Sequence, residues 1–257
     1  MPKHSNIQIF KYSNSVNQLL KKCEAKSGFA CDISYDETLA TDSTVKMAGR
    51  DGRLRHQIIL KQHNADADYY VAWQAVFILR QFSTDAENRA NISQNPEGFE
   101  STKAELGKLH PSMQGAELDN FANHILGGII TQLRSVPIGI LVDIYLFREF
   151  EELRETQEKV LTQQVHQYWP ALNIDKSQFP ETIILANQHM NAAHAAMVDY
   201  QYPSPELTAP YKMAGMEAIS LQLLDACLNR NDDDMQDKAI IDDWGKLLNI
   251  QNLYRWV

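Results

Sequence analysis

The spacing of apolar residues in the first 82 positions predicts a helix, three strands and a second helix. After Ser13, a suitable helix-capping residue, apolar side chains recur every three or four positions as far as Gly28, a residue typical of helix C-termini. Short runs in which apolar and polar residues alternate then predict strands, two of them joined by a turn at 49–52. The predicted strands cover residues 29–35, 44–48 and 54–61.

Residues 68–80 predict the second helix. Tyr69, Trp73 and Phe77 recur at helical spacing, and small and branched apolar residues widen the same face. We therefore expect a buried helix that packs across the sheet.

The pattern changes at residue 83. Residues 83–113 are rich in Ser, Thr, Asn, Glu, Gly and Pro, which predicts a connecting region with a short helix at 101–109. Helical spacing then predominates, with a break expected at Pro137 and a close backbone approach expected at Gly127 and Gly128. The predicted helices cover residues 114–134, 137–168, 180–197, 211–228 and 237–248, and the aromatic tail 254–257 is expected to dock.

These elements predict an α+β fold in which helices dominate. We expect a small N-terminal helix–sheet–helix lobe, residues 1–82, packed on a larger helical lobe, residues 114–257, with residues 83–113 between them. At 257 residues the chain is long enough to bury a sizeable core.

The net charge of −9 argues against general affinity for nucleic acid or for anionic membranes. The charge is unevenly distributed along the chain. Residues 1–64 carry 10 Lys and Arg against 6 Asp and Glu, whereas the remainder carries 14 against 27.

Cysteine usage and apolar run lengths predict a cytoplasmic, soluble protein. The three cysteines, Cys23, Cys31 and Cys227, are an odd number in a long chain, which favours reduced thiols in a reducing compartment. The start of the chain lacks the apolar core of a signal peptide. The longest apolar-rich run, 136–147, is about half a membrane span and contains Asp143, so no membrane association is expected.

Residues 68–80 resemble the short zinc-binding helix of ImmA/IrrE-type metallopeptidases in all but the chemistry. In that family a tyrosine or valine and a small residue precede H-E-x-x-H, and an apolar pair follows. Here Trp73 and Phe77 stand at the two histidine positions, and Gln74 stands at the glutamate position. Indole and phenyl rings cannot ligate zinc, and a neutral amide cannot accept a proton at neutral pH.

The resemblance implies a zincin-like domain over about residues 15–80 whose active site has been lost. It implies no catalytic residue, metal or cofactor at this helix, and a binding role in a regulatory or phage-defence-related system. An ordinary aromatic core helix that never held a metal explains the same residues. The sequence alone leaves both origins open.

A second candidate site lies on the predicted helix 114–134. Glu117 and His124 share one helix face, and Asp143 or Glu149 from the next predicted helix could complete a metal or acid–base cluster of a hydrolase. The alternative is an exposed polar face opposite the apolar stripe.

The predicted helix 180–197 carries the remaining polar candidates. His189 and His194 are about 140° apart around a helix, which is a poor arrangement for one ion. Asn187, Asn191 and His194 share a face, which indicates a polar helix–helix seam or a ligand site.

The basic residues Lys46, Arg50, Arg53 and Arg55 surround the predicted turn. They could contact an anion, an acidic partner or nucleic acid, or they could form a solvated hairpin tip. They could also meet the acidic helical half of the same chain or of a second copy.

We therefore expect a non-catalytic protein that acts by binding a protein partner or a second copy of itself. A hydrolase built around Glu117, His124 and Asp143 is the first alternative, and a nucleic-acid-binding accessory protein that uses residues 46–61 is the second. The chain contains no phosphate-binding glycine motif, nucleophile elbow or C-x-x-C pair.

Overall fold

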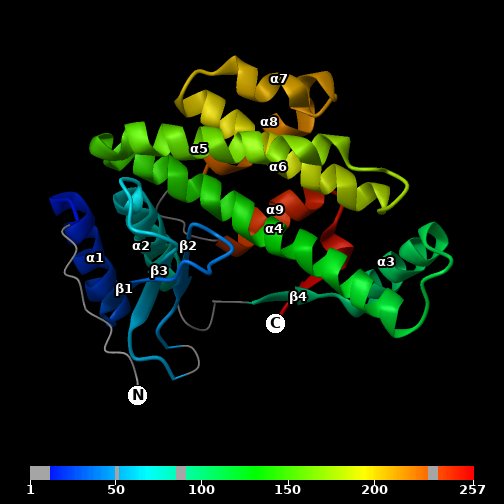
Figure 1. Cartoon of the computed structure of the whole chain (residues 1–257), viewed down its shortest axis with the longest axis horizontal. Coiled ribbons are helices and arrows are strands. Elements are labelled where there is room, and N and C mark those ends of the chain that lie inside the picture. The colour runs from blue at the N-terminus through cyan, green and yellow to red at the C-terminus, as the bar shows by residue number, and fades with distance from the viewer. Residues whose placement is uncertain (1–11, 50–51, 85–90, 231–236) are drawn as a thin grey trace. The chain divides into compact units, whose positions relative to one another are not determined.

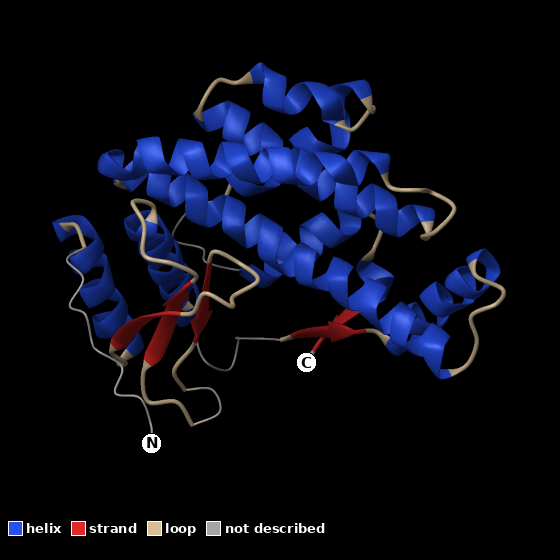
Figure 2. Cartoon of the chain, in the orientation of Figure 1, coloured by secondary structure: helices blue, strands red, loops and turns tan. Residues whose placement is uncertain are grey.

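The computed structural model describes residues 12–49, 52–84, 91–230 and 237–257. The chain divides into two compact units, unit 1 (Met1–Phe82) and unit 2 (Ser83–Val257). Helices dominate and strands are few (Figure 2), which confirms the predicted helix-dominated α+β class.

Unit 1 contains two helices and a three-stranded sheet. Its elements are α1 (Asn14–Ser27), β1 (Cys31–Tyr35), β2 (Ser43–Lys46), β3 (His56–Leu60) and α2 (Ala67–Ser83). The Ser13 side chain accepts a hydrogen bond from the Val16 N–H, and Gly28 ends α1 with a φ of 76°, as the sequence predicts. The strand order is β1-β3-β2, with β1 parallel and β2 antiparallel to β3.

The central strand β3 is held by a buried histidine as well as by its ladder. His56 Nδ1 accepts a hydrogen bond from the Ala48 N–H at 3.1 Å, which leaves Nε2 as the protonated nitrogen, 3.0 Å from Ser27 Oγ. Burial lowers the pKa of His56 because the charged imidazolium would lose its hydration. His56 is thus a neutral structural residue that ties β3 to the end of α1.

Unit 2 is built around the long helix α4 (Ala116–Glu149), which packs against α3, α5, α6, α8 and α9 (Figure 1). Leu126, Leu133, Ile140 and Leu146 of α4 are fully buried. The other helices of the described part are α3 (Pro96–Leu109), α5 (Arg154–Tyr168), α6 (Glu181–Gln201), α7 (Pro205–Met213), α8 (Glu217–Leu228) and α9 (Asp237–Leu247). Short 3₁₀ turns occur at η2 (Glu151–Leu153), η3 (Trp169–Asn173) and η4 (Gln251–Leu253), and the strands are β4 (Ile92–Gln94) and β5 (Tyr254–Trp256).

The predicted break at Pro137 is wrong, because α4 passes through this residue and ends only at Phe150. Proline inside a helix costs about 3 kcal/mol, since it removes an N–H donor and crowds the preceding turn. Leu133 and Ile138 beside it are buried, so apolar packing offsets this cost. The second predicted helix, 137–168, is therefore divided between the end of α4 and α5.

The predicted helix 211–228 is also divided. Gly215 adopts a φ of 77°, a left-handed conformation that favours glycine, between α7 and α8. The Met216 N–H donates to the Tyr211 carbonyl at 2.9 Å and closes the end of α7. This break lets α7 and α8 turn along α6 as two separate helices.

The region predicted as a connection, 83–113, contributes β4 and α3 to unit 2. β4 pairs antiparallel with β5, so the aromatic tail docks as the sequence predicts. Gly98 of α3 lies directly against the backbone of Asn252 and Leu253, where a Cβ atom would clash. No such approach surrounds the glycines of α4: a Cβ at Gly128 would meet no atom within 4 Å, so the close approach expected there is absent.

The length and composition of α4 would allow it to cross a membrane. Its most apolar window has a mean hydropathy of 1.7, and half of that window is buried inside the structure. The buried core helix of a soluble protein can have the same length and the same apolar composition.

Candidate functional site

The three α2 residues at the metal-motif positions of the resemblance take part in packing and hydrogen bonding. The Trp73 and Phe77 rings stack with centroids 5.8 Å apart. Gln74 is buried, and its Nε2 donates to Ser43 Oγ of β2 at 2.9 Å. Within the described residues no three His, Cys, Asp or Glu side chains are grouped as a metal site would require. The family resemblance itself stays a prediction.

The basic residues around the 49–52 turn differ in their surroundings. Lys46 is exposed, Arg53 is half-buried and Arg50 lies outside the described residues. Arg55 Nε is 2.8 Å from Asp32 Oδ2, and both side chains are about half exposed, so this ion pair is weak. Leu54, between the two arginines, is 81% exposed.

The structure does not bring the second candidate cluster together. Because α4 is continuous, His124 and Asp143 are separated by roughly 29 Å along one helix axis. Glu117 and His124 are exposed, whereas Asp143 is buried and accepts a hydrogen bond from Gln157 Nε2 at 3.3 Å. Gln157 in turn accepts one from the Tyr202 hydroxyl at 2.8 Å, so Asp143 belongs to a buried structural chain.

Glu149, the other acid considered for that cluster, is exposed at the C-terminal end of α4. The expectation that a second helix would return these carboxylates to His124 is wrong for the same reason as the break at Pro137. One helix holds all four residues, and its length keeps the two pairs apart.

The polar seam predicted on the helix at 180–197 is present between α4 and α6. Three amides form a closed ring: Gln132 Nε2 donates to Asn191 Oδ1 at 2.9 Å, and Asn191 Nδ2 donates to Asn187 Oδ1 at 3.2 Å. Asn187 Nδ2 then donates to Gln132 Oε1 at 2.8 Å. His194 packs elsewhere, against Tyr168 of α5.

A groove between α6, α7 and α8, here called the α6–α8 groove, was not predicted from the sequence. Its volume is about 370 Å³, within the range of roughly 300–1,000 Å³ that is usual for ligand pockets. Its apolar walls come from α6 and α8: Ala192, Ala196, Leu221, Leu224 and Leu228.

Exposed apolar side chains gather at this groove. Tyr200 and Leu221 line it and are 61% and 45% exposed. Met213 of α7 is 90% exposed as well, but it does not line the groove. Two of the six large apolar side chains that are exposed in the described part of the chain therefore line one groove.

The rim of the α6–α8 groove is acidic. Asp199, Glu217 and Asp225 line it together with the single ammonium group of Lys212, which lies 3.3 Å from Glu217. Asp199 also fixes the start of α7, because its carboxylate accepts hydrogen bonds from the Ser204 N–H and, less closely, from the Thr208 hydroxyl. The rim is thus negatively charged, and hydrogen bonds from the start of α7 fix the position of the Asp199 carboxylate.

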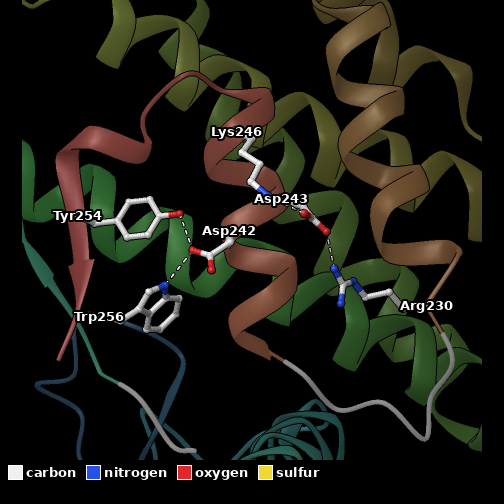
Figure 3. Close-up of polar contacts among 6 residues, drawn as sticks. All are labelled: Arg230, Asp242, Asp243, Lys246, Tyr254 and Trp256. Atoms are coloured by element: carbon white, nitrogen blue, oxygen red, sulfur yellow. Dashed lines mark hydrogen bonds and ion pairs between the residues drawn. The ribbon is translucent and has the colours of Figure 1, made fainter.

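A second polar cluster joins the C-terminal strand to α9 (Figure 3). Asp242 Oδ1 accepts hydrogen bonds from the Tyr254 hydroxyl at 2.9 Å and from Trp256 Nε1 at 2.8 Å. On the next residue of the helix, Asp243 pairs with Arg230 and Lys246. The contacts of Asp242 anchor β5 to α9. Both carboxylates of this cluster are engaged within the protein, so we do not treat it as a binding site.

Sequence reasoning missed the α6–α8 groove because it treated residues 211–228 as one helix. A signal was present in the spacing Leu221–Leu224–Leu228, which extends the apolar face of α8 beyond its buried residues. The chain matches no protein-family model, no curated protein and no solved structure.

Proposed function

We infer that this protein is non-catalytic and acts by binding another protein through the α6–α8 groove. The observation that carries this proposal is an apolar groove with an acidic rim that is lined by two exposed large apolar side chains, Tyr200 and Leu221. Exposed apolar patches with polar rims are typical of protein-binding surfaces.

The energetics favour a protein ligand with an apolar anchor. Full burial of a Leu or Met side chain contributes about 1.5–3 kcal/mol, so covering two or three such side chains supplies a substantial part of a micromolar affinity. The carboxylates at the rim would select a partner whose anchor is flanked by basic residues.

The non-catalytic part of the proposal is supported by the chemistry of α2. Trp73 and Phe77 offer only ring carbons and an indole N–H, and Gln74 offers a neutral amide that already bonds Ser43. A regulatory or phage-defence-related setting is the role that the ImmA/IrrE-like resemblance suggests for such a protein.

Photo-crosslinking in the native host tests the binding surface. A benzophenone amino acid placed at position 200 or 221, both of which line the groove, is expected to form discrete covalent adducts with a protein, and Leu221→Glu should remove the adducts formed from position 200. Position 109, also an exposed leucine but on α3, serves as the matched control. Adducts no stronger at the groove than at position 109 would contradict the proposal.

Metal analysis tests the non-catalytic part independently. The purified protein is expected to hold far less than one transition-metal ion per chain. A tightly held ion at one per chain would show that a metal site exists and would contradict this part of the proposal.

A further inference from the structure

We propose that the occupant of the α6–α8 groove is the segment Arg53-Leu54-Arg55 of a second copy of this chain, with the Leu54 side chain inserted between α6 and α8. This proposal rests on the proposed function, since it uses the same groove and names its partner. It makes the protein self-assembling.

The tip segment presents an apolar side chain in a defined position. Leu54 is 81% exposed, although it lies between the buried residues Ala48 and His56. The Gly49 N–H donates to the Arg53 carbonyl at 2.9 Å, and the His56 N–H donates to the Ala30 carbonyl at 2.9 Å. Backbone bonds therefore hold the segment on both sides of Leu54, so little ordering is needed when it binds.

The groove matches this segment in size, in apolar character and in charge. Its walls are formed by alanine and leucine side chains, and its volume of about 370 Å³ accommodates a branched aliphatic side chain. Lys212 already pairs with Glu217, so Asp225 and the remaining acceptor positions of Asp199 face the partner as carboxylates. Arg55 also pairs with Asp32, but both side chains are about half exposed, so this contact is weak and leaves guanidinium N–H groups for a second acceptor. Arg53 and Arg55 flank Leu54, and Asp199 and Asp225 line the apolar groove, so the signs of the charges match.

The charge of the whole chain favours the same pairing. Unit 1 carries 11 Lys and Arg against 8 Asp and Glu, a net charge of +3, whereas unit 2 carries 13 against 25, a net charge of −12. Two helical units repel each other, while a basic tip of one copy is attracted to the helical unit of another. Opposite charge thus selects a tip-to-groove contact over a groove-to-groove contact.

A tip-to-groove contact is heterologous, because each copy offers two different surfaces. Every copy carries one tip and one groove, so successive copies join head to tail and form rings or open filaments. This predicts that the size of the assembly grows with protein concentration.

Sedimentation velocity over a concentration series tests the proposal. The wild type should self-associate, and Leu54→Glu or Leu221→Glu should each weaken the association by about tenfold or more, because each places a carboxylate in the apolar contact. Leu109→Glu makes the same chemical change on α3, which contributes nothing to the groove, and should associate like the wild type. Circular dichroism confirms that each variant is folded. A wild type that stays monomeric throughout overturns the proposal.

A mixing experiment identifies the two halves of the contact. Leu54→Glu keeps an intact groove and Leu221→Glu keeps an intact tip, so an equimolar mixture should form a 1:1 dimer and nothing larger. Each variant alone should associate more weakly than the wild type, by about tenfold or more, at the same concentration. If mixing restores no dimer, the two residues do not face each other across copies, and docking within one chain or a different interface replaces the proposal.

Charge reversal provides a second, independent check. Arg53→Glu/Arg55→Glu should weaken the association, and adding Asp225→Arg to the same chain should recover part of it. Failure of this rescue would show that Asp225 does not face the arginines of the tip, and would overturn the proposed contact. Crosslinks from position 200 to a different protein, combined with a monomeric wild type, would remove self-assembly and leave the proposed function standing.

Discussion

Burial decides what the histidines of unit 2 can do. The His194 ring packs edge-on against Tyr168 with centroids 5.6 Å apart, and its Nδ1 has no hydrogen-bond partner among the described residues. Burial lowers its pKa to about 4, because the charged ring would lose its hydration without gaining a counter-charge. His194 is therefore neutral at pH 7 and poorly matched to proton transfer near neutrality.

We predict that acid destabilises the wild type more than His194→Leu. The unfolded chain takes up a proton on this ring below its ordinary pKa of 6.5, whereas the folded chain does so only near pH 4. Between these values the unfolded state binds more protons, so the free energy of unfolding falls as the pH falls, by at most about 3 kcal/mol. Denaturant unfolding at neutral pH and close to pH 4 measures the difference.

The exposed His124 supplies the control for that experiment. His124→Gln should lose stability on acidification as the wild type does. Burial also lowers the pKa values of His56 and His189, so the pH dependence of His194→Leu should be reduced and not abolished. Equal losses in the wild type and in His194→Leu would show that this ring does not contribute.

Between elements, α4 and α6 are joined by an amide ring in which each side chain donates once and accepts once. We predict that Gln132→Leu costs about 1–2 kcal/mol, because the Asn187 Nδ2 loses its acceptor and the Asn191 Oδ1 loses its donor in a partly buried seam. The triple variant that changes all three residues to Leu should recover most of this loss, since no polar group is then left unpaired. Chemical denaturation of the three proteins tests this, and a triple variant less stable than the single one would contradict it.

Glycine plays opposite roles in α3 and α4. We predict that Gly98→Ala destabilises unit 2 and exposes β5, because its Cβ would meet the backbone of Asn252 and Leu253. Gly128→Ala should instead stabilise the chain by about 0.5–1 kcal/mol, because nothing lies within 4 Å of its Cβ and alanine favours the helix. Thermal unfolding gives both signs, and amide hydrogen exchange in residues 254–256 locates the first effect.

A destabilised Gly128→Ala would mean that the two α4 glycines are kept for a contact that this structure does not contain. If amide hydrogen exchange in residues 254–256 is unchanged in Gly98→Ala, then α3 shifts to accommodate the added Cβ and β5 stays in place. The second result would revise how the terminal strand is held.

The whole molecule carries its charge asymmetrically, with a basic unit 1 and a strongly acidic unit 2. We predict that self-association weakens as salt is raised, but is not abolished. The Debye length falls from about 10 Å at 0.1 M to about 3 Å at 1 M salt, which screens the arginine–carboxylate rim and leaves the apolar contact of Leu54. Sedimentation velocity at the two salt concentrations measures this, and association that strengthens with salt would show that the rim charges do not contribute.

Local signals determined much of unit 1 directly. Ser13 and Gly28 mark the ends of α1 because a capping hydroxyl and a left-handed glycine satisfy the helix termini without distant partners. The alternation over residues 31–35 and the antiparallel pairing of β2 with β3 likewise join segments that are close in sequence, while residues 50–51 of the predicted 49–52 turn lie outside the described residues. The parallel pairing of β1 with β3 could not be predicted from local signals, because the two strands are separated in the sequence by β2 and its flanking loops.

In unit 2 the sequence alone determined the helical class, the docked aromatic tail and the polar face of α6, since periodicity and composition carry these features. Only the tertiary structure decided that α4 continues through Pro137, because burial around the proline outweighs its local cost. It also decided that Asp143 and His124 lie far apart on α4. The tertiary structure likewise produced the apolar groove with an acidic rim, which forms where α7 turns away from α8. Both outcomes depend on packing between distant segments, and local spacing does not encode which of them meet.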